Sequence, residues 1–489
     1  MSVRVRYAPS PTGLQHIGGV RTALFNYFFA RSEGGVFVLR IEDTDRERYD
    51  EKALTDIYET FEWLGIHPDE GPEVGGPYGP YVQSQREELY RRHAEELVEK
   101  GYAYRAYETP EELEAMRAEV GGYDRSGRDL SDEQRRELER QGRTPVVRFK
   151  VPLEGDTSFE DVVLGRVKRK NKDIPADPVL LKSDGLPTYH LANVVDDHHM
   201  DITHILRAQE WVPSGALHVL LYTALGWEPP VYCHLPMVMG KDGQKLSKRH
   251  GATSAIEFRQ QGYLPEAIVN YVTLLGWAYD DSREFFTTAD LERLFSLEKI
   301  NKAPAVFDYK KLEWFNGVYI REKSDDELQD MVLPYLQSEG LVSRPPSEHE
   351  LSILQGAMPL IKERMKYLSQ APELVRFLYR EVDDYDITLA IPKKHTAAET
   401  RSLLNEAESL LEGFENRSDE ENEEAFRNRA DEIDSKIGNL LMPVRVAVTG
   451  SRVSPPLFGS IRLLGVETTR RRIERAKELL QNKIEEGEE

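Results

Sequence analysis

A glycine-rich loop near the N-terminus combines residue types that can bind an anion. The sequence PSPTGLQHIGG, at residues 9–19, joins an alternating apolar run to a segment with helical apolar spacing. Glycines permit close backbone approach, and a helix N-terminus presents free N–H groups and a positive partial charge. His16 adds an imidazole that can donate to a phosphate oxygen. The loop lacks the GxxxxGK[ST] and GxGxxG spacings, and its glycines alone are more typical of an ordinary strand–helix turn.

A second loop, MGKDGQKLSKRHG at residues 239–251, supplies positive charge. It contains Lys241, Lys245 and Lys248 between glycines that allow movement. Lysines in such a loop can hold the β and γ phosphates of a nucleotide and neutralise charge as pyrophosphate leaves. KLSKR alone could equally be a basic surface loop. Together, the two loops indicate a site that closes on a nucleoside triphosphate.

The composition indicates a multidomain globular protein. The chain has 489 residues, 39% of them hydrophobic, and contains no apolar run of the length, roughly 20 residues, that crosses a bilayer. Cys233 is the only cysteine, which excludes an intramolecular disulfide and fits a reducing cytoplasm. The net charge of −22 means that nucleic acid would bind only at a focused basic surface.

The order of apolar patterns predicts an α/β domain with an insertion. Strand patterns at residues 3–8 and 36–42 alternate with helical patterns at 18–32 and 43–66, the latter with Asp43 and Asp45 near its start. Residues 86–188 form the insertion, with strands expected at 146–151 and 161–167. Strand patterns resume at 201–206 and 234–239. From Ser254 onward we expect helices and no further strand.

Four motifs in order resemble those of bacterial glutamyl-tRNA synthetases, which are class I aminoacyl-tRNA synthetases. They are PSPTGLQHIGG, RIEDTD at 40–45, YHLANVVDDH at 189–198 and KLSKR. The resemblance extends to GGPYGPYVQSQR at 75–86 and WFNGVYIRE at 314–322, and so covers essentially the whole chain. HIGG and KLSKR replace the HIGH and KMSKS of the generic class, as is usual for glutamate enzymes.

The resemblance implies a Rossmann-like α/β catalytic domain, an inserted α+β acceptor-binding domain, and all-α stem-contact and anticodon-binding domains. The expected bounds are 1–85 and 189–253 for the two halves of the catalytic domain, 86–188 for the insertion, 254–322 for the stem-contact domain, and 323–375 and 376–489 for two anticodon-binding domains.

The implied reaction is ATP-dependent attachment of L-glutamate to the 3′ end of tRNA(Glu) through glutamyl-adenylate. The carboxylate of the amino acid is already ionised, so its attack on the α-phosphorus needs positioning and charge stabilisation but no general base. The resemblance assigns catalysis to His16, Lys245 and Lys248. It assigns ATP binding to Thr12, Gly13, His16, Gly18, Gly19, Glu210, Trp211, Lys245, Ser247 and Lys248. Mg²⁺ is expected with ATP, although no acidic motif forms a dedicated cage.

Glutamate presents two carboxylates and one ammonium, which call for arginines and an acid. By resemblance, Arg6 and Arg207 bind the substrate carboxylates, and Glu42 binds the ammonium. Tyr189 and Asn193, four residues apart on one helical face, add hydrogen bonds. Ala8, through its backbone, and Ser10 complete the expected glutamate site.

Two sequence features raise the question of a metal ion. DDHHM, at residues 196–200, places two carboxylates beside two imidazoles, but adjacent helical residues point apart, so structural hydrogen bonding is favoured. Some relatives hold zinc in the insertion through cysteines, whereas the equivalent GYAYRAYETPEE, at 101–112, has none. No protein-bound metal and no structural zinc are therefore predicted.

The helical C-terminal part is expected to bind tRNA. By resemblance, Arg48 faces the acceptor end, Arg364 is the best candidate to read the anticodon, and Arg445 adds a basic group. Basic segments such as ETTRRRIE, at 467–474, could equally be solvated helix faces. The sequence leaves open whether tRNA(Gln) is also charged. A cytoplasmic monomer is expected.

Three other functions fit only part of the sequence. A truncated relative that glutamylates a modified tRNA base would resemble the catalytic half alone, and a small-molecule nucleotidyltransferase would not need a long helical C-terminal part. A tRNA-binding module without activity would not retain His16, Lys245, Lys248, Arg6 and Arg207 together.

Overall fold

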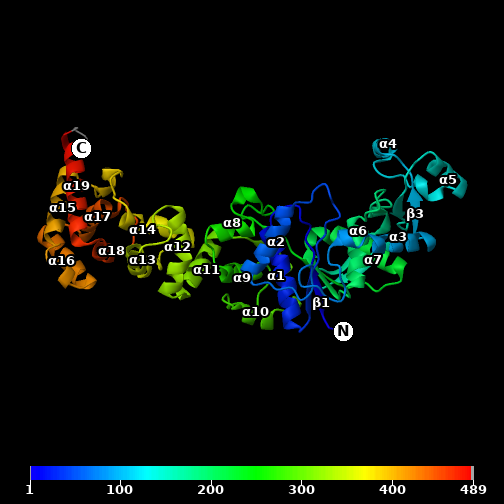
Figure 1. Ribbon diagram of the computed structural model, residues 1–489, viewed down its shortest axis with the longest axis horizontal. Helices are drawn as coiled ribbons and strands as arrows, with labels where there is room; N and C mark the ends of the chain where they lie inside the picture. The colour runs from blue at the N-terminus through cyan, green and yellow to red at the C-terminus, as the bar shows by residue number, and fades with distance from the viewer. Residues whose placement is uncertain (1, 486–489) are drawn as a thin grey trace. The chain divides into compact units, whose positions relative to one another are not determined.

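The computed structural model describes residues 2–485, and the chain divides into two compact units (Figure 1). Unit 1 comprises Met1–Arg259 and Pro265–Tyr309, and unit 2 comprises Gln260–Leu264 and Lys310–Glu489. None of the helices among the described residues is long and apolar enough to cross a membrane.

Parallel strands joined by helices form the centre of unit 1. β1 (Arg4–Tyr7) pairs in parallel with β2 (Val36–Leu39), and α1 (Ile17–Ser32) connects them. β8 (His204–Ala208) pairs in parallel with β9 (Val231–Leu235) through α7 (Val212–Leu225). The Thr203 N–H donates to the Arg4 carbonyl over 2.9 Å, which places the start of β8 beside β1. The carboxyl ends of β1 and β8 therefore lie together, where a ligand binds in an open α/β sheet.

α1 is apolar on all sides and is buried accordingly. Ile17, Phe25 and Phe28 are fully buried, and the Phe25 ring packs edge-on against Phe295 with centroids 5.1 Å apart. α9 (Pro265–Thr273) and α10 (Thr288–Leu294) cover the side of α1 that faces away from the strands (Figure 1). This rigid packing fixes the N-terminus of α1, which begins directly after His16.

The remaining strands of unit 1 include one correction to the sequence prediction. β5 (Asp156–Asp161) and β6 (Gly165–Lys170) form an antiparallel hairpin at the edge of the β8–β9 sheet, in the order β6-β5-β9-β8. The prediction of one strand over 161–167 was wrong. The Asp161 carboxylate accepts the N–H groups of Val163 and Leu164, and Gly165 adopts φ 74°, which together turn the chain at this point.

The insertion carries its own small sheet. β3 (Ala103–Ala106), β4 (Val146–Phe149) and β7 (Val179–Leu181) are antiparallel, in the order β3-β4-β7. The helices here are α3 (Glu87–Glu99), α4 (Pro110–Val120) and α5 (Asp132–Arg140), and α6 (Tyr189–His199) follows.

The second helix begins later than predicted. α2 (Glu51–Leu64) starts after Asp50, whose carboxylate accepts the Lys52 N–H over 2.9 Å. Asp43, expected near the start of this helix, instead accepts from the Ser84 N–H and hydroxyl. The better-placed N-cap therefore determines where the helix begins.

The C-terminal part of unit 1 holds α8 (Ala255–Gln260) and a two-residue strand, β11 (Ala305–Val306), which pairs with β10 (Val238–Met239). The prediction of no strand after Ser254 was therefore wrong, because the segment is too short for an alternating pattern.

Within the described residues, unit 2 after Lys310 is built from helices alone (Figure 1). The C-terminal helices enclose an apolar core that includes Phe414, Phe426 and Leu440. The helices are α11 (Tyr309–Glu322), α12 (Asp325–Ser338), α13 (Glu348–Ile361), α14 (Ala371–Tyr379), α15 (Ala397–Ser409), α16 (Asp419–Glu432), α17 (Ile437–Thr449), α18 (Leu457–Leu464) and α19 (Val466–Glu485).

Candidate active site

A cavity of about 560 Å³ in unit 1 brings together most of the predicted site residues. It lies at the carboxyl ends of β1 and β8, between the N-terminus of α1 and the KLSKR loop. Its lining includes Arg6, Ala8, His16, Gly18, Gly19, Glu42, Tyr189, Asn193, Arg207, Glu210, Trp211, Lys245, Ser247 and Lys248. Segments from opposite ends of the catalytic domain thus form one site.

Three predicted residues lie outside this lining. Ser10 donates from its hydroxyl to the Glu42 carbonyl over 2.7 Å, so it braces the segment that carries Glu42. Thr12 and Gly13 lie on the loop before His16, and a Cβ atom added at Gly13 would meet nothing within 4 Å. Sequence reasoning missed Arg21, which lines the cavity and donates to the Leu275 and Pro236 carbonyls. The sequence could have indicated Arg21, because it lies one turn into the helix that begins after His16 and so shares a face with the start of that helix.

His16 is held in one orientation by the start of α1. It is the N-cap residue, and its Nδ1 atom accepts the Gly18 N–H over 3.1 Å. In a neutral imidazole the hydrogen is then on Nε2, which is left as a donor. Burial and the nearby Lys245 ammonium both lower the pKa of His16. His16 is therefore a neutral hydrogen-bond donor, suited to a phosphate oxygen.

The KLSKR loop is shaped by its own side chains. A tight turn closes where the Gly240 N–H donates to the Gln244 carbonyl over 2.8 Å. His250 Nδ1 accepts the Ser247 N–H over 3.0 Å, while its Nε2 lies 3.1 Å from the Asp242 carboxylate. The imidazole thereby ties the two ends of the loop. Lys245 Nζ lies 2.7 Å from Glu210 Oε2.

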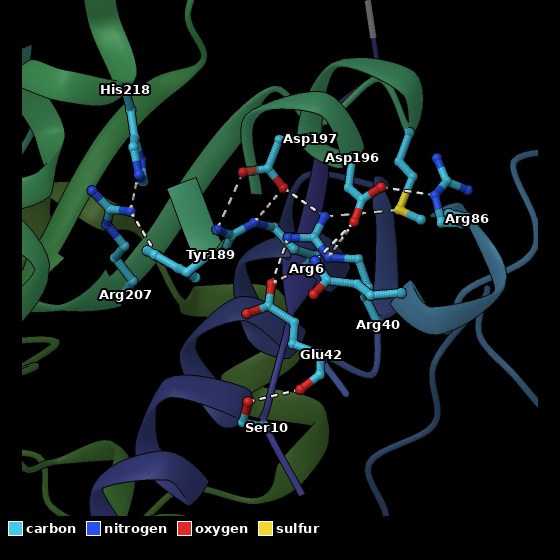
Figure 2. A network of polar contacts seen from close by, with 12 residues as sticks. Arg6, Ser10, Arg40, Glu42, Arg86, Tyr189, Asp196, Asp197, Arg207 and His218 are labelled. Carbon is cyan, nitrogen blue, oxygen red and sulfur yellow. Dashed lines mark hydrogen bonds and ion pairs between the residues drawn. The ribbon is translucent and has the colours of Figure 1, made fainter. Parts of the chain in front are cut away.

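A buried network of charges holds Arg6 and Glu42 (Figure 2). Asp197 accepts from Arg6 Nε over 2.9 Å and from Arg40 Nη1 over 2.7 Å. Arg40 also donates to Glu42 over 3.0 Å, and the Arg40 side chain is fully buried. Burial opposes the charge on Asp197, but Arg6 and Arg40 hold its pKa below the usual value. Burial raises the pKa of Glu42, and Arg40 opposes that rise.

Asp196, adjacent in sequence to Asp197, faces a different set of groups. It accepts from Arg86 Nε over 2.7 Å and from the Tyr90 hydroxyl over 2.8 Å. The two histidines that follow also lie in hydrogen-bonding or stacking contacts: His199 Nε2 is 2.8 Å from His93 Nε2, and His198 stacks on Trp227. Within residues 2–485, no group of three or more potential ligands is placed to hold a metal ion.

The network of arginines and carboxylates is balanced in charge, and Arg207 is not part of it. Among the described residues no carboxylate forms an ion pair with Arg207. Its hydrogen-bond partners are neutral: His234 Nε2 at 3.0 Å, the Tyr189 hydroxyl at 3.2 Å, the Trp211 carbonyl at 3.3 Å and His218 Nδ1 at 3.4 Å. Arg207 is only 5% exposed and lines the cavity. A buried cation without an anion is costly, so this part of the cavity favours a carboxylate ligand. The balanced members are Arg6, Arg40, Arg86, Glu42, Asp196 and Asp197.

The predicted tRNA-contact arginines lie apart from the cavity lining. Arg48 of unit 1 is largely exposed, with Asp45 3.9 Å away. In unit 2, Arg364 lines a groove of about 660 Å³ together with the exposed Trp314. Arg445 is half-buried on α17 and donates to the Pro455 carbonyl over 2.9 Å. Burial and the nearby Arg364 lower the pKa of Arg445, so the two guanidiniums form a locally positive region.

Comparison with known proteins agrees with this architecture. The catalytic-domain model of class I tRNA synthetases (E and Q) matches residues 2–314, and an anticodon binding domain model matches residues 327–477. The chain is 57% identical over 486 residues to the glutamate–tRNA ligase of Borreliella burgdorferi, covering 98% of this chain and 99% of the relative. It is 53% identical over 501 residues to that of Treponema denticola, covering 97% and 99% of the two chains.

A solved structure extends the comparison to the whole fold. The glutamate tRNA ligase of Elizabethkingia meningosepticum, crystallised in complex with its amino acid, is 36% identical, has a TM-score of 0.84, and is matched over 98% of this chain and 100% of its own. The chain therefore belongs to the glutamate–tRNA ligase family, within the class I tRNA synthetases of the E and Q type.

Proposed function

We propose that the protein attaches L-glutamate to the 3′ end of tRNA(Glu) in two steps, through glutamyl-adenylate. The observation that carries this proposal is the position of Arg207. It is a buried arginine that has no anionic partner within residues 2–485, and it lies in the same cavity as His16 and Lys245. One cavity thus offers a charge for a substrate carboxylate and donors for a triphosphate.

In the proposed complex, the glutamate side-chain carboxylate binds to Arg207 and the Tyr189 hydroxyl. Arg6 lines the same cavity but is already paired with Asp197, so its remaining N–H groups add hydrogen bonds more than net charge. Glu42 receives the substrate ammonium. Asn193 Oδ1 is buried without a hydrogen-bond partner, which supports a contact with the substrate.

ATP lies between the two loops in this proposal. Thr12, Gly13, Gly18 and Gly19 line the approach to the α1 N-terminus, Trp211 and Glu210 contact the nucleoside, and Ser247, Lys245 and Lys248 contact the phosphates. Mg²⁺ accompanies ATP as part of the substrate complex. Removal of one such charge-stabilising donor typically raises the barrier by about 3–4 kcal/mol, or roughly 10²–10³ in rate.

The first of the two chemical steps needs no base from the protein. The ionised glutamate carboxylate attacks the α-phosphorus, and pyrophosphate leaves with its charge neutralised by Lys245 and Lys248, while His16 donates a hydrogen bond to a phosphate oxygen. A ribose hydroxyl of the terminal adenosine then attacks the adenylate carbonyl; the ester bond forms, the bond from the carbonyl carbon to the phosphate oxygen breaks, and AMP and the hydroxyl proton are released. We propose that the first step depends on bound tRNA.

The tRNA is proposed to contact Arg48, Arg364 and Arg445. The groove with Arg364 and Trp314 offers a cation beside an aromatic side chain, a combination that suits unstacked bases. The domains proposed for tRNA contact are the insertion at 86–188, the stem-contact domain at 254–322 and the helical domains at 323–375 and 376–489. The enzyme is proposed to act as a cytoplasmic monomer.

Aminoacylation assays with purified tRNA(Glu) and tRNA(Gln) test this function. Charging of tRNA(Glu) with glutamate is expected, and failure to charge it would overturn the proposal. Charging of tRNA(Gln) with glutamate in the same assay would identify a non-discriminating enzyme.

A further inference from the structure

A chain of buried hydrogen bonds connects Arg207 to a carboxylate two strands away. β8, β9 and β5 are neighbours in the sheet, and Arg207 and His234 are register partners on β8 and β9. Arg207 Nε donates to His234 Nε2 over 3.0 Å, and His234 Nδ1 lies 2.6 Å from Asp161 Oδ2. The side chains of His234 and Asp161 are both fully buried.

The partners of His234 determine where its hydrogen lies. A guanidinium can only donate, so His234 Nε2 must accept, and the hydrogen of the neutral ring is on Nδ1. That Nδ1–H donates to Asp161. Asp161 also accepts the backbone N–H groups of His234, Val163 and Leu164, so each of these contacts is donated to Asp161.

The two arginines of the cavity are thus held in opposite ways. Arg6 is bound directly by the Asp197 carboxylate, which neutralises its charge. Arg207 is bound by a neutral imidazole, and the Asp161 carboxylate is separated from it by the width of that ring. A carboxylate directly on Arg207 would compete with a substrate carboxylate, whereas an imidazole fixes the orientation of the guanidinium and leaves its charge available.

We propose that Asp161 and His234 are positioning residues that hold Arg207 ready for the substrate's side-chain carboxylate; this proposal rests on the proposed role of Arg207 in glutamate binding. Asp161 fixes the tautomer of His234, and His234 fixes Arg207. The specificity of the site for an acidic amino acid therefore depends on a carboxylate that does not touch the substrate.

The surroundings of His234 keep its Nε2 able to accept. Burial lowers the pKa of His234, and of its two closest charged neighbours, Asp161 raises and Arg207 lowers that pKa. The Tyr232 ring stacks parallel to the imidazole, with centroids 5.8 Å apart, and lies beneath the Arg207 guanidinium. A proton on His234 Nε2 would face the Nε–H donor of Arg207. The observed contact between the two side chains therefore requires a neutral imidazole.

Two substitutions of His234 separate its two hydrogen bonds. In His234→Gln the amide oxygen can occupy the Nε2 position and accept from Arg207, but the donor to Asp161 is lost. In His234→Asn the amide N–H can replace Nδ1–H toward Asp161, but the acceptor for Arg207 is lost. We expect His234→Asn to raise the KM for glutamate roughly ten- to a hundredfold, with KM for ATP unchanged, and His234→Gln to raise it less.

Asp161→Asn tests the tautomer directly. An amide N–H at the Oδ2 position would face the Nδ1–H of His234, so the ring would change tautomer and present a donor to Arg207. We expect an increase in the KM for glutamate as large as that of His234→Asn. His204→Asn, at the other end of β8, is the matched control; His204 bonds to Thr203 and should leave KM for glutamate unchanged.

The measurements are the KM values for glutamate and ATP in aminoacylation of tRNA(Glu), with thermal melting of each variant. The inference is overturned if His234→Asn and His234→Gln have equal KM values for glutamate, or if both substrates' KM values rise together as the melting temperature falls. If the unmodified enzyme does not charge glutamate at all, the proposed function fails instead.

Discussion

Lys245 and Glu210 form an ion pair in the cavity of unit 1, with Nζ and Oε2 2.7 Å apart. Their side chains are 58% and 50% exposed, so water screens the pair and its contribution to stability is at most about 1 kcal/mol. Glu210 also opposes the lowering of the pKa of His16 that Lys245 causes. The pair is therefore weak, and in the proposed function a triphosphate replaces Glu210 as the partner of Lys245.

Lys245→Ala is expected to lower the rate of ATP–pyrophosphate exchange, measured with tRNA present, by about 10²–10³. In the proposed function, the Lys245 ammonium stabilises the negative charge that develops as pyrophosphate leaves. Lys241→Ala is the matched control, because Lys241 lies on the same loop but pairs with Asp308 at 3.0 Å and does not line the cavity. Equal losses in the two variants would assign the effect to the general charge of the loop.

Local motifs pointed to His16, Lys245 and Lys248, and the structure places all three in the lining of this cavity. His16 is placed by the helix that starts after it, and Lys245 and Lys248 by a short glycine-flanked loop, so their roles depend on near neighbours. The resemblance to a family added Arg6, Glu42 and Arg207. The pairings among distant residues could not be read from the sequence, because only the tertiary fold decides which acid meets which arginine.

Arg6 shows this limit most clearly. Its carboxylate partner, Asp197, is 191 residues away in the chain, and the neighbouring Asp196 has the same local pattern but binds Arg86. His234 lies in an apolar strand, and nothing in the sequence indicated that it would contact Arg207. The start of α2 and the β5–β6 hairpin were mispredicted for a related reason: single side-chain hydrogen bonds from Asp50 and Asp161 determined where the elements begin and end.

Asp197→Asn is expected to destabilise unit 1 and to weaken glutamate binding. The change leaves Arg6 and Arg40 buried with too little negative charge, and breaking a buried pair in this way typically costs about 3–5 kcal/mol. Thermal melting and the KM for glutamate measure the two effects. Glu87→Gln removes an exposed pair with Arg46 and should change stability by no more than about 0.5 kcal/mol. A variant of Asp197 as stable as that control would show that the network is not strongly coupled.

Stability is expected to fall between pH 6.5 and 4 because of His190, a partly buried histidine beside His218. Burial lowers the pKa of His190 from 6.5 to about 4, and His218 Nε2 lies 3.1 Å from its Nδ1. The unfolded chain takes up this proton near pH 6.5 and the folded protein only near pH 4, so the free energy of unfolding is highest above the window and decreases as pH falls through it. The slope is about 1.4 kcal/mol per pH unit for one such group.

His190→Asn should therefore reduce the difference in unfolding free energy between pH 7 and pH 5 by about 2 kcal/mol. Urea unfolding at both pH values provides the measurement. His349→Asn, at an exposed position, is the control and should leave the difference as in the unmodified protein. An unchanged pH dependence in the His190 variant would mean that other groups cause the acid sensitivity.

Removal of metal ions is expected to leave the insertion folded, because its polar centre is built from side chains. Asp177 is fully buried, and it accepts from the Tyr104 hydroxyl over 2.8 Å and from the Val151 N–H over 3.1 Å. It also forms an ion pair with Arg128 at 2.5 Å. These bonds hold β3, the segment after β4 and the loop before β7 together, which is the task that a structural zinc performs where cysteines are available.

Treatment with a strong chelator, followed by its removal and by addition of Mg²⁺ for the charging assay, should accordingly leave the melting temperature and the charging rate unchanged. Asp177→Asn should lower the melting temperature by leaving Arg128 without its buried anion. Glu160→Gln, which removes an exposed carboxylate 3.9 Å from Arg166, is the control for loss of one acidic charge. Elemental analysis of the purified protein completes the test. The prediction would be contradicted by one zinc ion per chain that is lost on chelation together with stability. The side chains that bond to Asp177 already hold these three segments together, so a bound ion has no role there.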